Sequence, residues 1–176
     1  MPGFVALLRG REFPLHRQSL IGNRMPDVLI LMGSKTDEQI MKGSADYLTK
    51  FGISNEIKIS SAHRRPDETA ALVKKAESDG YKVIIAAAGM AAHLPGFCAS
   101  LTTLPVIGVP LGGSELNGVD ALYSIVQMPA GVPVATVAIG SAGAKNAAVL
   151  AAEILALSDR ALKQKLQEFR KNSSTF

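Results

Sequence analysis

The sequence predicts an α/β fold in which one parallel sheet is covered by helices on both faces. Five short apolar segments alternate along the chain with segments of helical periodicity, which is the pattern of a parallel sheet with crossover helices. Most of the apolar segments are continuous runs, as expected for strands that are buried on both faces. Hydrophobic residues make up 47% of the 176 residues, but aromatic residues only 5%. Aliphatic side chains therefore have to form the core.

The first two strand–helix units carry the clearest signals. The first unit begins with a strand at residues 27–32 and continues as a helix from about residue 38 to residue 51. Gly52 follows that helix, at the position where glycine commonly ends one. The second unit has a strand at residues 56–60 and a helix at residues 66–79, which begins with a proline, a residue suited to the first helical turn.

The remaining elements continue the alternation of strands and helices. Residues 89–96 are read as a loop, because they hold mainly small residues. Asp159 precedes a charged C-terminal segment and is a suitable N-cap for a last helix. The other expected strands are 82–88, 106–111 and 132–139, and the other expected helices are 119–126, 144–157 and 159–171.

Right-handed crossovers leave few topologies open for five parallel strands. We expect a three-layer α/β/α sandwich of flavodoxin-like (Rossmann-like) type, with strand order 2-1-3-4-5 and an added C-terminal helix. Its switch point lies between the first and third strands, and ligands bind there beyond the carboxyl ends of the strands. Candidate ligand-binding residues follow the first three strands, namely Ser34, Lys35 and Asp37, then Ser61, His63 and Arg64, then Gly89 and His93.

Charge and composition argue against several classes of protein. The net charge is +4, but residues 1–24 hold four arginines and one acidic residue, which leaves +1 for the rest of the chain. The folded part is therefore nearly neutral and lacks the basic face of a nucleic-acid-binding protein. No apolar run reaches the ~20 residues that a membrane span requires. The single cysteine, Cys98, allows no intramolecular disulfide, which indicates a reducing, cytoplasmic location.

We expect the chain to consist of an extension and one domain. Residues 1–24 lack a consistent hydrophobic period and are predicted to be a disordered N-terminal extension, because chain ends are poorly ordered unless they are tied down. His16 lies in this extension, and no functional role is expected for it. Residues 25–176 are expected to form a single domain that includes the C-terminal helix.

The strongest functional signal is the sequence Ser-Ala-His-Arg-Arg-Pro at residues 61–66, between a predicted strand and a predicted helix. Histidine titrates near neutral pH and commonly acts as an acid and a base, so His63 is the candidate catalytic residue. Arg64 offers a guanidinium group that can hold a phosphate at two points. The alternatives are a structural histidine and a solvated arginine pair, and Arg65 fits the latter best.

The loops after the first and third strands add candidate ligand groups. Residues 33–37 read Gly-Ser-Lys-Thr-Asp before a helix, whose free N–H groups and positive dipole end favour a phosphate. Asp37 can either cap that helix or hold ribose hydroxyls. The small residues around His93 let the backbone approach a ligand closely, although His93 can equally serve to order its loop. The spacing of a P-loop is absent.

Neither a metal site nor a reactive thiol is predicted. His63 and His93 lie thirty residues apart without ligand-spaced carboxylates, which is a weak pattern for a metal site. Cys98 stands among apolar residues and is read as a buried, inert thiol.

Several motifs together point to one family. They are Met-Gly-Ser-Lys-Thr-Asp (32–37), Ser-Ala-His-Arg (61–64), Ala-Ala-His-Leu-Pro-Gly (91–96), Gly-Val-Asp-Ala-Leu-Tyr-Ser-Ile-Val-Gln-Met-Pro (118–129) and Ala-Ile-Gly with Ala-Gly-Ala and Asn-Ala-Ala (138–148). In this order, and from about residue 27 to residue 170, they resemble class I N5-carboxyaminoimidazole ribonucleotide mutase of purine biosynthesis.

This resemblance implies an isomerase that converts N5-carboxyaminoimidazole ribonucleotide into 4-carboxy-5-aminoimidazole ribonucleotide. It implies that the enzyme needs no cofactor or metal and forms a homo-octamer with sites at subunit contacts. It also implies the residue roles: His63 is the acid and base, Ser34 and Arg64 bind phosphate, Asp37 binds the ribose hydroxyls, and Ser61, Gly89 and His93 line the base pocket.

The chain departs from the family pattern in three places. Relatives commonly have Gly-Ala-Gly-Gly where this chain has Ala87-Ala88-Gly89-Met90, so its third loop is bulkier. Ala130 and Ser141 replace residues that are basic in many relatives. These departures concern the pocket and the subunit contacts rather than His63.

Two alternative functions are considered beside the mutase. One is an aminoimidazole ribonucleotide carboxylase that uses free carbon dioxide, but that type typically has Lys-Gly where this chain has Arg64-Arg65. The other is a flavodoxin-like module that binds a nucleotide without catalysis.

The last helix has a narrow apolar stripe that can pack on its own domain or on a neighbouring subunit, and the resemblance favours the neighbour.

Overall fold

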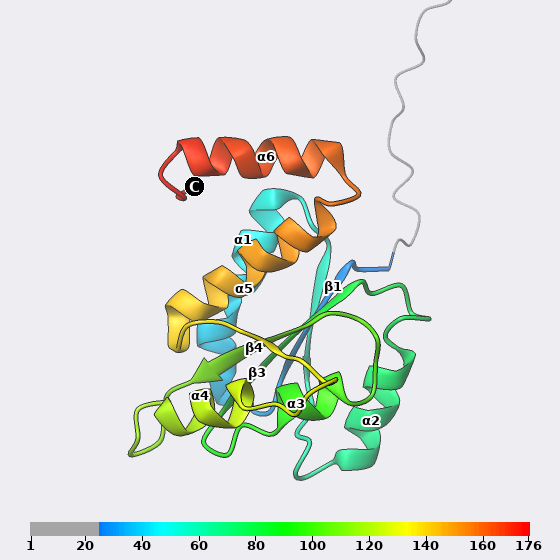
Figure 1. Ribbon diagram of the computed structural model, residues 1–176, viewed down its shortest axis with the longest axis vertical. Helices are drawn as coiled ribbons and strands as arrows, with labels where there is room; N and C mark the ends of the chain where they lie inside the picture. The colour runs from blue at the N-terminus through cyan, green and yellow to red at the C-terminus, as the bar shows by residue number, and fades with distance from the viewer. Residues whose placement is uncertain (1–24) are drawn as a thin grey trace, which may run out of the picture.

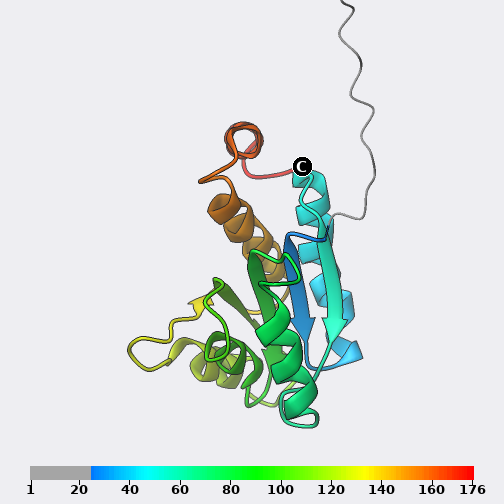
Figure 2. The same cartoon turned by 90° about the vertical axis from the view of Figure 1, so that its right-hand side faces the viewer.

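The computed structural model describes residues 25–176, so the N-terminal extension predicted for residues 1–24 lies outside the described residues. Five parallel strands form one sheet in the predicted order β2-β1-β3-β4-β5, with helices on both faces (Figure 1, Figure 2). No described helix is long and apolar enough to cross a membrane. The strands are β1 (Val28–Met32), β2 (Asn55–Ile59), β3 (Val83–Gly89), β4 (Val106–Leu111) and β5 (Ala135–Thr136), and the helices are η1 (Lys35–Asp37), α1 (Glu38–Phe51), α2 (Pro66–Lys75), α3 (Leu94–Ala99), α4 (Val119–Val126), α5 (Gly140–Leu155) and α6 (Arg160–Lys171).

The central strand β1 divides the core into two layers. Successive side chains of a strand point to opposite faces of the sheet, and all five residues of β1 are fully buried. Val28, Ile30 and Met32 belong to the cluster that includes α1, α5 and α6. Leu29 and Leu31 belong to the cluster on the other face, with α2 and α3. The continuous aliphatic run in the sequence is therefore explained by burial on both faces.

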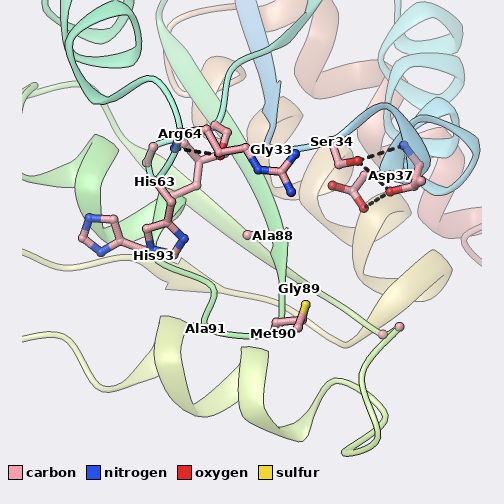
Figure 3. A pocket seen from close by; sticks show the side chains of 16 residues that line it. Gly33, Ser34, Asp37, His63, Arg64, Ala88, Gly89, Met90, Ala91 and His93 are labelled. Atoms are coloured by element: carbon pink, nitrogen blue, oxygen red, sulfur yellow. Dashed lines mark hydrogen bonds between the residues drawn. The ribbon is translucent and has the colours of Figure 1, made fainter.

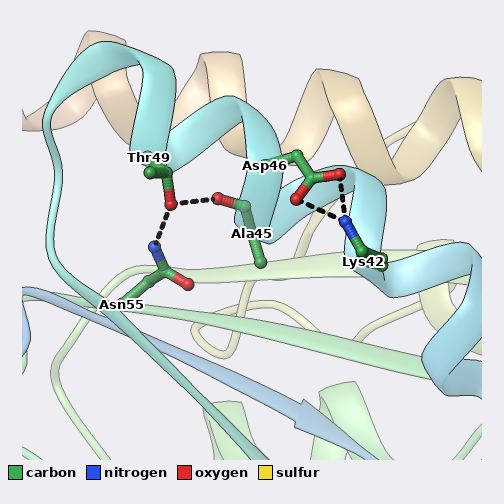
Figure 4. A network of polar contacts seen from close by, with 5 residues as sticks. All are labelled: Lys42, Ala45, Asp46, Thr49 and Asn55. Carbon is green, nitrogen blue, oxygen red and sulfur yellow. Dashed lines mark hydrogen bonds and ion pairs between the residues drawn. The ribbon is translucent and has the colours of Figure 1, made fainter.

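The end of α1 and the start of β2 are joined by polar contacts. Gly52 ends α1 with a left-handed backbone (φ 80°), a conformation that favours glycine. The Thr49 hydroxyl donates to the carbonyl of the preceding turn at 2.8 Å, and it accepts a bond of 3.4 Å from the Asn55 side-chain amide (Figure 4). The neighbouring ion pair of Lys42 and Asp46 is exposed, so it adds little to stability.

Two elements on the β4 side of the sheet differ from the prediction. Helix α3 was not expected: the predicted loop 89–96 includes its first three residues. Its six residues are too few to show helical periodicity, and its best signal is the proline in its first turn. Strand β5 was expected over eight residues and has two. It lies at the sheet edge and pairs only with β4, and Pro133 in the expected segment has no N–H for a sheet hydrogen bond.

Two helices have different ends from those expected. Helix α5 begins at Gly140 rather than at Ala144, because its first turn contains two glycines and no large apolar residue that would reveal its period. Helix α2 ends at Lys75, and turns continue from there to Gly80. The other predicted helices, including the exact span of α4, are confirmed.

The C-terminal helix α6 packs on its own domain, across the ends of α1 and α5 (Figure 1). Its stripe of Leu162, Leu166 and Phe169 is buried in the cluster beneath it. The Phe169 ring meets the Phe51 ring edge-on at 5.2 Å, and Lys165 donates a 2.8 Å hydrogen bond to the Phe51 carbonyl. The expectation that this stripe packs on a neighbouring subunit is therefore wrong. The last turn of α1 offers the Phe51 ring and the Phe51 carbonyl as partners on the same chain.

Candidate active site

A cavity of about 350 Å³ opens at the carboxyl ends of β1, β3 and β4, beside the loop that follows β2. This is the place where parallel sheets of this order commonly bind ligands. The seven residues predicted for the site all line this one cavity (Figure 3), and they are Ser34, Asp37, Ser61, His63, Arg64, Gly89 and His93. The strand-end argument thus located the cavity from the sequence.

The loop after β1 places two hydroxyls and a carboxylate at the cavity. Ser34 is the N-cap of η1, and its hydroxyl accepts hydrogen bonds from the Thr36 N–H at 3.3 Å and from the Thr36 hydroxyl at 2.8 Å. Asp37 precedes α1 but makes no side-chain cap hydrogen bond to it. Its carboxylate is therefore not used as a helix cap, and this leaves it for a ligand.

The Asp37 carboxyl is half-buried at the cavity wall. Burial raises its pKa above the ordinary 3.8, and hydrogen bonds from the Ser34 main chain and the Thr36 side chain oppose the rise. Burial disfavours the charged form because the carboxylate loses water. A neutral partner with two hydroxyls, such as a ribose, can replace that water without adding a second negative charge.

The loop after β2 carries the candidate acid and base. The Ser61 carbonyl accepts from the Arg65 N–H at 2.8 Å, and the Ser61 hydroxyl lies 3.4 Å from the Arg64 N–H, so Ser61 holds the turn before α2. Both His63 and Arg64 are exposed, and the Arg64 side chain extends toward the loop of Ser34 (Figure 3). The next residue, Arg65, does not line the cavity, and its guanidinium group lies 3.4 Å from the Glu68 carboxylate. It is the solvated arginine that the sequence suggested.

The two histidines of the site are stacked on each other. The His63 and His93 rings lie 5.2 Å apart, at an angle of 13°. His93 also contacts the Phe97 ring of α3, at 5.4 Å. His63 is thus backed by a ring that the helix itself supports. The missed helix α3 contributes to the site because it holds this stack in place.

The loop after β3 brings small residues to the cavity. Gly89 lines the cavity, but a Cβ atom at this position would lie 3.2 Å from the Leu111 carbonyl oxygen. The close approach that requires glycine here is thus to the end of β4. Next to it, Met90 has a left-handed backbone (φ 56°) and an exposed side chain at the cavity edge.

Sequence reasoning missed the contribution of β4. Gly112 and Gly113 follow this strand and line the cavity. The signal was present, because a glycine pair at a strand end obeys the same rule as the other loops. Two further residues named from the sequence lie elsewhere: Lys35 lines a separate surface groove, and Cys98 is fully buried. Burial raises the pKa of the Cys98 thiol to about 12, which makes it the inert thiol that was predicted.

The cavity has one polar side and one apolar side. Hydroxyls, the Asp37 carboxylate and the Arg64 guanidinium come from the loops after β1 and β2. Small or apolar residues come mainly from the loop after β3, and the two histidines lie on the left of the view in Figure 3. A ligand with a phosphate and hydroxyls at one end and a small planar group at the other matches this division. A proton-transferring group would then stand beside the planar end.

Comparisons with known proteins agree with this geometry. The model of the AIR carboxylase family matches residues 27–175. The chain belongs to the AIR carboxylase family. Over 145 residues it is 57% identical to the N5-carboxyaminoimidazole ribonucleotide mutase of Brucella melitensis, covering 82% of this chain and 90% of that protein. It is 51% identical over 149 residues to the mutase of Escherichia coli K12, covering 85% and 88% of the two chains.

Solved structures of this family have the same fold. The crystal structure of Treponema denticola PurE superposes with a TM-score of 0.76 at 32% sequence identity. The match covers 84% of this chain and 90% of that one. Family membership confirms the resemblance drawn from the sequence motifs, and the superposition confirms the three-layer fold.

Proposed function

We propose that the chain is an N5-carboxyaminoimidazole ribonucleotide mutase, an isomerase of purine biosynthesis. The observation that carries the proposal is the cavity at the strand ends, which joins an exposed histidine to a polar wall and an apolar wall. The identity of 49–57% to curated mutases supports this substrate. The loop sequence Arg64-Arg65 also fits the mutase better than the carboxylase alternative.

The proposed binding mode follows from the division of the cavity. Ser34 and Arg64 bind the phosphate, because a guanidinium group and hydroxyls suit its oxygens. Asp37 accepts hydrogen bonds from the ribose hydroxyls. The aminoimidazole ring then lies toward Ser61, Gly89 and His93. The small side chains in this part of the cavity leave room for a flat ring.

The proposed reaction needs one proton-transferring group. His63 donates a proton to the exocyclic nitrogen N5, the bond from N5 to the carboxylate carbon breaks, and carbon dioxide is released. Ring carbon C4, made electron-rich by the amino group, forms a bond to the same carbon dioxide. His63 then takes the C4 proton, which restores its starting state. Imidazole suits both transfers because it exchanges protons near neutral pH.

The site must also keep carbon dioxide from leaving before C4 attacks it. Holding the two fragments together makes the second step effectively unimolecular. Small apolar residues such as Ala88 and Ala91 line the cavity near the ring. They offer no group that would compete with C4 for the carbon dioxide.

We also propose that the enzyme is a cytoplasmic homo-octamer with its sites at subunit contacts. Exposed apolar side chains of Val119, Tyr123 and Val126 recur at positions that share one face of α4, and Leu116 is 61% exposed just before the helix. A concentration of exposed apolar residues favours a subunit interface. Helix α4 begins six residues after Gly113, the last of the glycines that line the cavity.

Sedimentation velocity at micromolar concentration tests the assembly. We expect an octamer for the unaltered chain and smaller species for Tyr123→Asp. Leu157→Asp is the matched control, because Leu157 is 89% exposed but lies far from α4 along the chain. A monomer for the unaltered protein would contradict the proposed assembly.

An ultraviolet assay for the C4-carboxylated product tests the proposed reaction. One reaction receives the N5-carboxylated nucleotide, and the other receives the decarboxylated nucleotide with bicarbonate. An enzyme-free control corrects for spontaneous loss of carbon dioxide from the first substrate. We expect rapid product from the N5-carboxylated nucleotide and little from the second mixture. Product that forms only at high bicarbonate would instead identify a carboxylase.

A further inference from the structure

Met90 combines a strained backbone with an exposed apolar side chain at the site. Its φ angle of 56° lies in the left-handed region, which side chains other than glycine rarely adopt. Its side chain is 64% exposed, although methionine is usually buried. Strain of this kind persists where the surrounding structure imposes it, and it is common at ligand-binding sites.

Contacts on both sides of Met90 hold its main chain in place. The Met90 carbonyl accepts from the Ala92 N–H at 2.8 Å, and the Ala91 carbonyl accepts from the His93 N–H at 2.6 Å. These two tight turns lead directly into α3. On the other side, Gly89 is held against the end of β4. The main chain of the loop is therefore held at the cavity wall, where Met90 is one of the lining residues.

Met90 is the large, uncovered apolar side chain among the residues that line this cavity. Its neighbours Ala88, Gly89 and Ala91 are small, and Leu94 is 3% exposed and thus fixed in the core. Figure 3 shows Met90 beside Gly89, on the side of the cavity away from Ser34 and Arg64. By the proposed binding mode, this side receives the aminoimidazole ring.

We propose that Met90 covers the reacting end of the bound nucleotide and retains carbon dioxide between the two steps. This inference rests on the proposed mutase function. An unbranched thioether side chain can adapt its shape to a ring beneath it. An apolar cover also excludes water from the reactive fragments. Met90 forms no covalent bond and transfers no proton. Its role is to limit the escape of carbon dioxide from the cavity.

The test follows the origin of the carboxylate carbon in the product. Unlabelled N5-carboxylated nucleotide is supplied in buffer with ¹³C-bicarbonate and carbonic anhydrase, and mass spectrometry measures the labelled fraction of the C4 product at early times. Retained carbon dioxide gives unlabelled product, whereas escape and re-entry give labelled product. Met90→Ala, Met90→Leu and Met90→Gly are compared with the unaltered protein, and thermal unfolding verifies that each variant is folded.

We expect the labelled fraction to rise several-fold in Met90→Ala and to stay near the starting value in Met90→Leu, which keeps an apolar cover. Met90→Gly removes the cover and the strain together, so its labelled fraction should rise as much as that of Met90→Ala. Equal labelling in Met90→Ala and the unaltered protein would overturn the inference. A raised labelled fraction in Met90→Gly alone would also overturn it, because the change in the main chain, and not the loss of the side chain, would then cause the escape of carbon dioxide. Failure of the unaltered protein to form any C4 product would overturn the proposed mutase function and this inference together.

Discussion

At the residue scale, the Asp37 carboxyl is placed for binding at a cost to the stability of the fold. Burial raises its pKa in the folded state above 3.8, the ordinary value that represents the unfolded chain. A carboxyl group whose pKa is raised in the folded state disfavours folding at every pH at which it is ionised. Its unfavourable effect is therefore absent below the ordinary pKa and complete once the pH has risen through the folded-state pKa.

Asp37→Asn should therefore melt at a higher temperature than the unaltered protein near neutral pH, while it binds the nucleotide more weakly. The gain should shrink as the pH falls through the raised folded-state pKa and vanish well below 3.8, where the carboxyl is protonated in both states. Thermal unfolding across this pH range measures the effect. Asp46→Asn is the control, because this exposed carboxylate pairs with Lys42 and should change little. A lower melting temperature for Asp37→Asn at neutral pH would refute the argument.

The sequence predicted which residues line the site better than it predicted why each residue type is needed there. His63 and Arg64 could be placed because polar residues after a buried strand reach the ligand edge of a parallel sheet. The need for glycine at position 89 was assigned to a ligand, but it comes from the Leu111 carbonyl on the next strand. The stacking of His63 on His93 also needed the structure, since it depends on the relative position of two loops.

At the element scale, the packing of α5 depends on one residue without a side chain. A Cβ atom at Gly143 would overlap the Ala138 carbonyl, which belongs to the main chain and cannot move aside easily. Gly43 lies inside α1, and a Cβ atom there would make only an ordinary contact at 3.7 Å with Lys145. Replacing these two glycines by alanine should therefore have opposite effects on the stability of the protein.

Gly143→Ala should lower the free energy of unfolding by about 3 kcal/mol, the upper part of the range for overpacking in a core. Gly43→Ala should raise it by up to about 1 kcal/mol, because alanine is the better helix former. Denaturant unfolding of the two variants gives both values. A stabilised Gly143→Ala variant would show that the first turn of α5 packs differently.

Elements with a strong local pattern were predicted well, and elements fixed by neighbours were not. Strand β4 and helix α4 match their predicted spans because each has a clear apolar period and clear ends. Helix α3 and the short β5 depend on contacts with β3 and β4 that no local pattern records. Short elements of this kind bury too few residues to show a period.

At the scale of the whole molecule, the sheet order determines which loops form the site. The order 2-1-3-4-5 was predictable, because alternating strands and helices with right-handed crossovers leave few arrangements. It brings the loops after β1, β2 and β3 to one cavity. The packing of α6 was not predictable, since its apolar stripe suits any apolar surface, whether on its own chain or on another.

The central claim is that His63 transfers both protons in this cavity, and His63→Asn tests it most directly. The ultraviolet assay and a nucleotide-binding measurement are made on the unaltered protein, on His63→Asn and on Arg65→Ala, a control at an exposed position outside the cavity. We expect His63→Asn to stay folded and to bind nucleotide, but to lose at least about 10²–10⁴-fold in turnover. Arg65→Ala should keep its turnover. A His63→Asn variant that still forms the C4-carboxylated product at the unaltered rate would contradict the account.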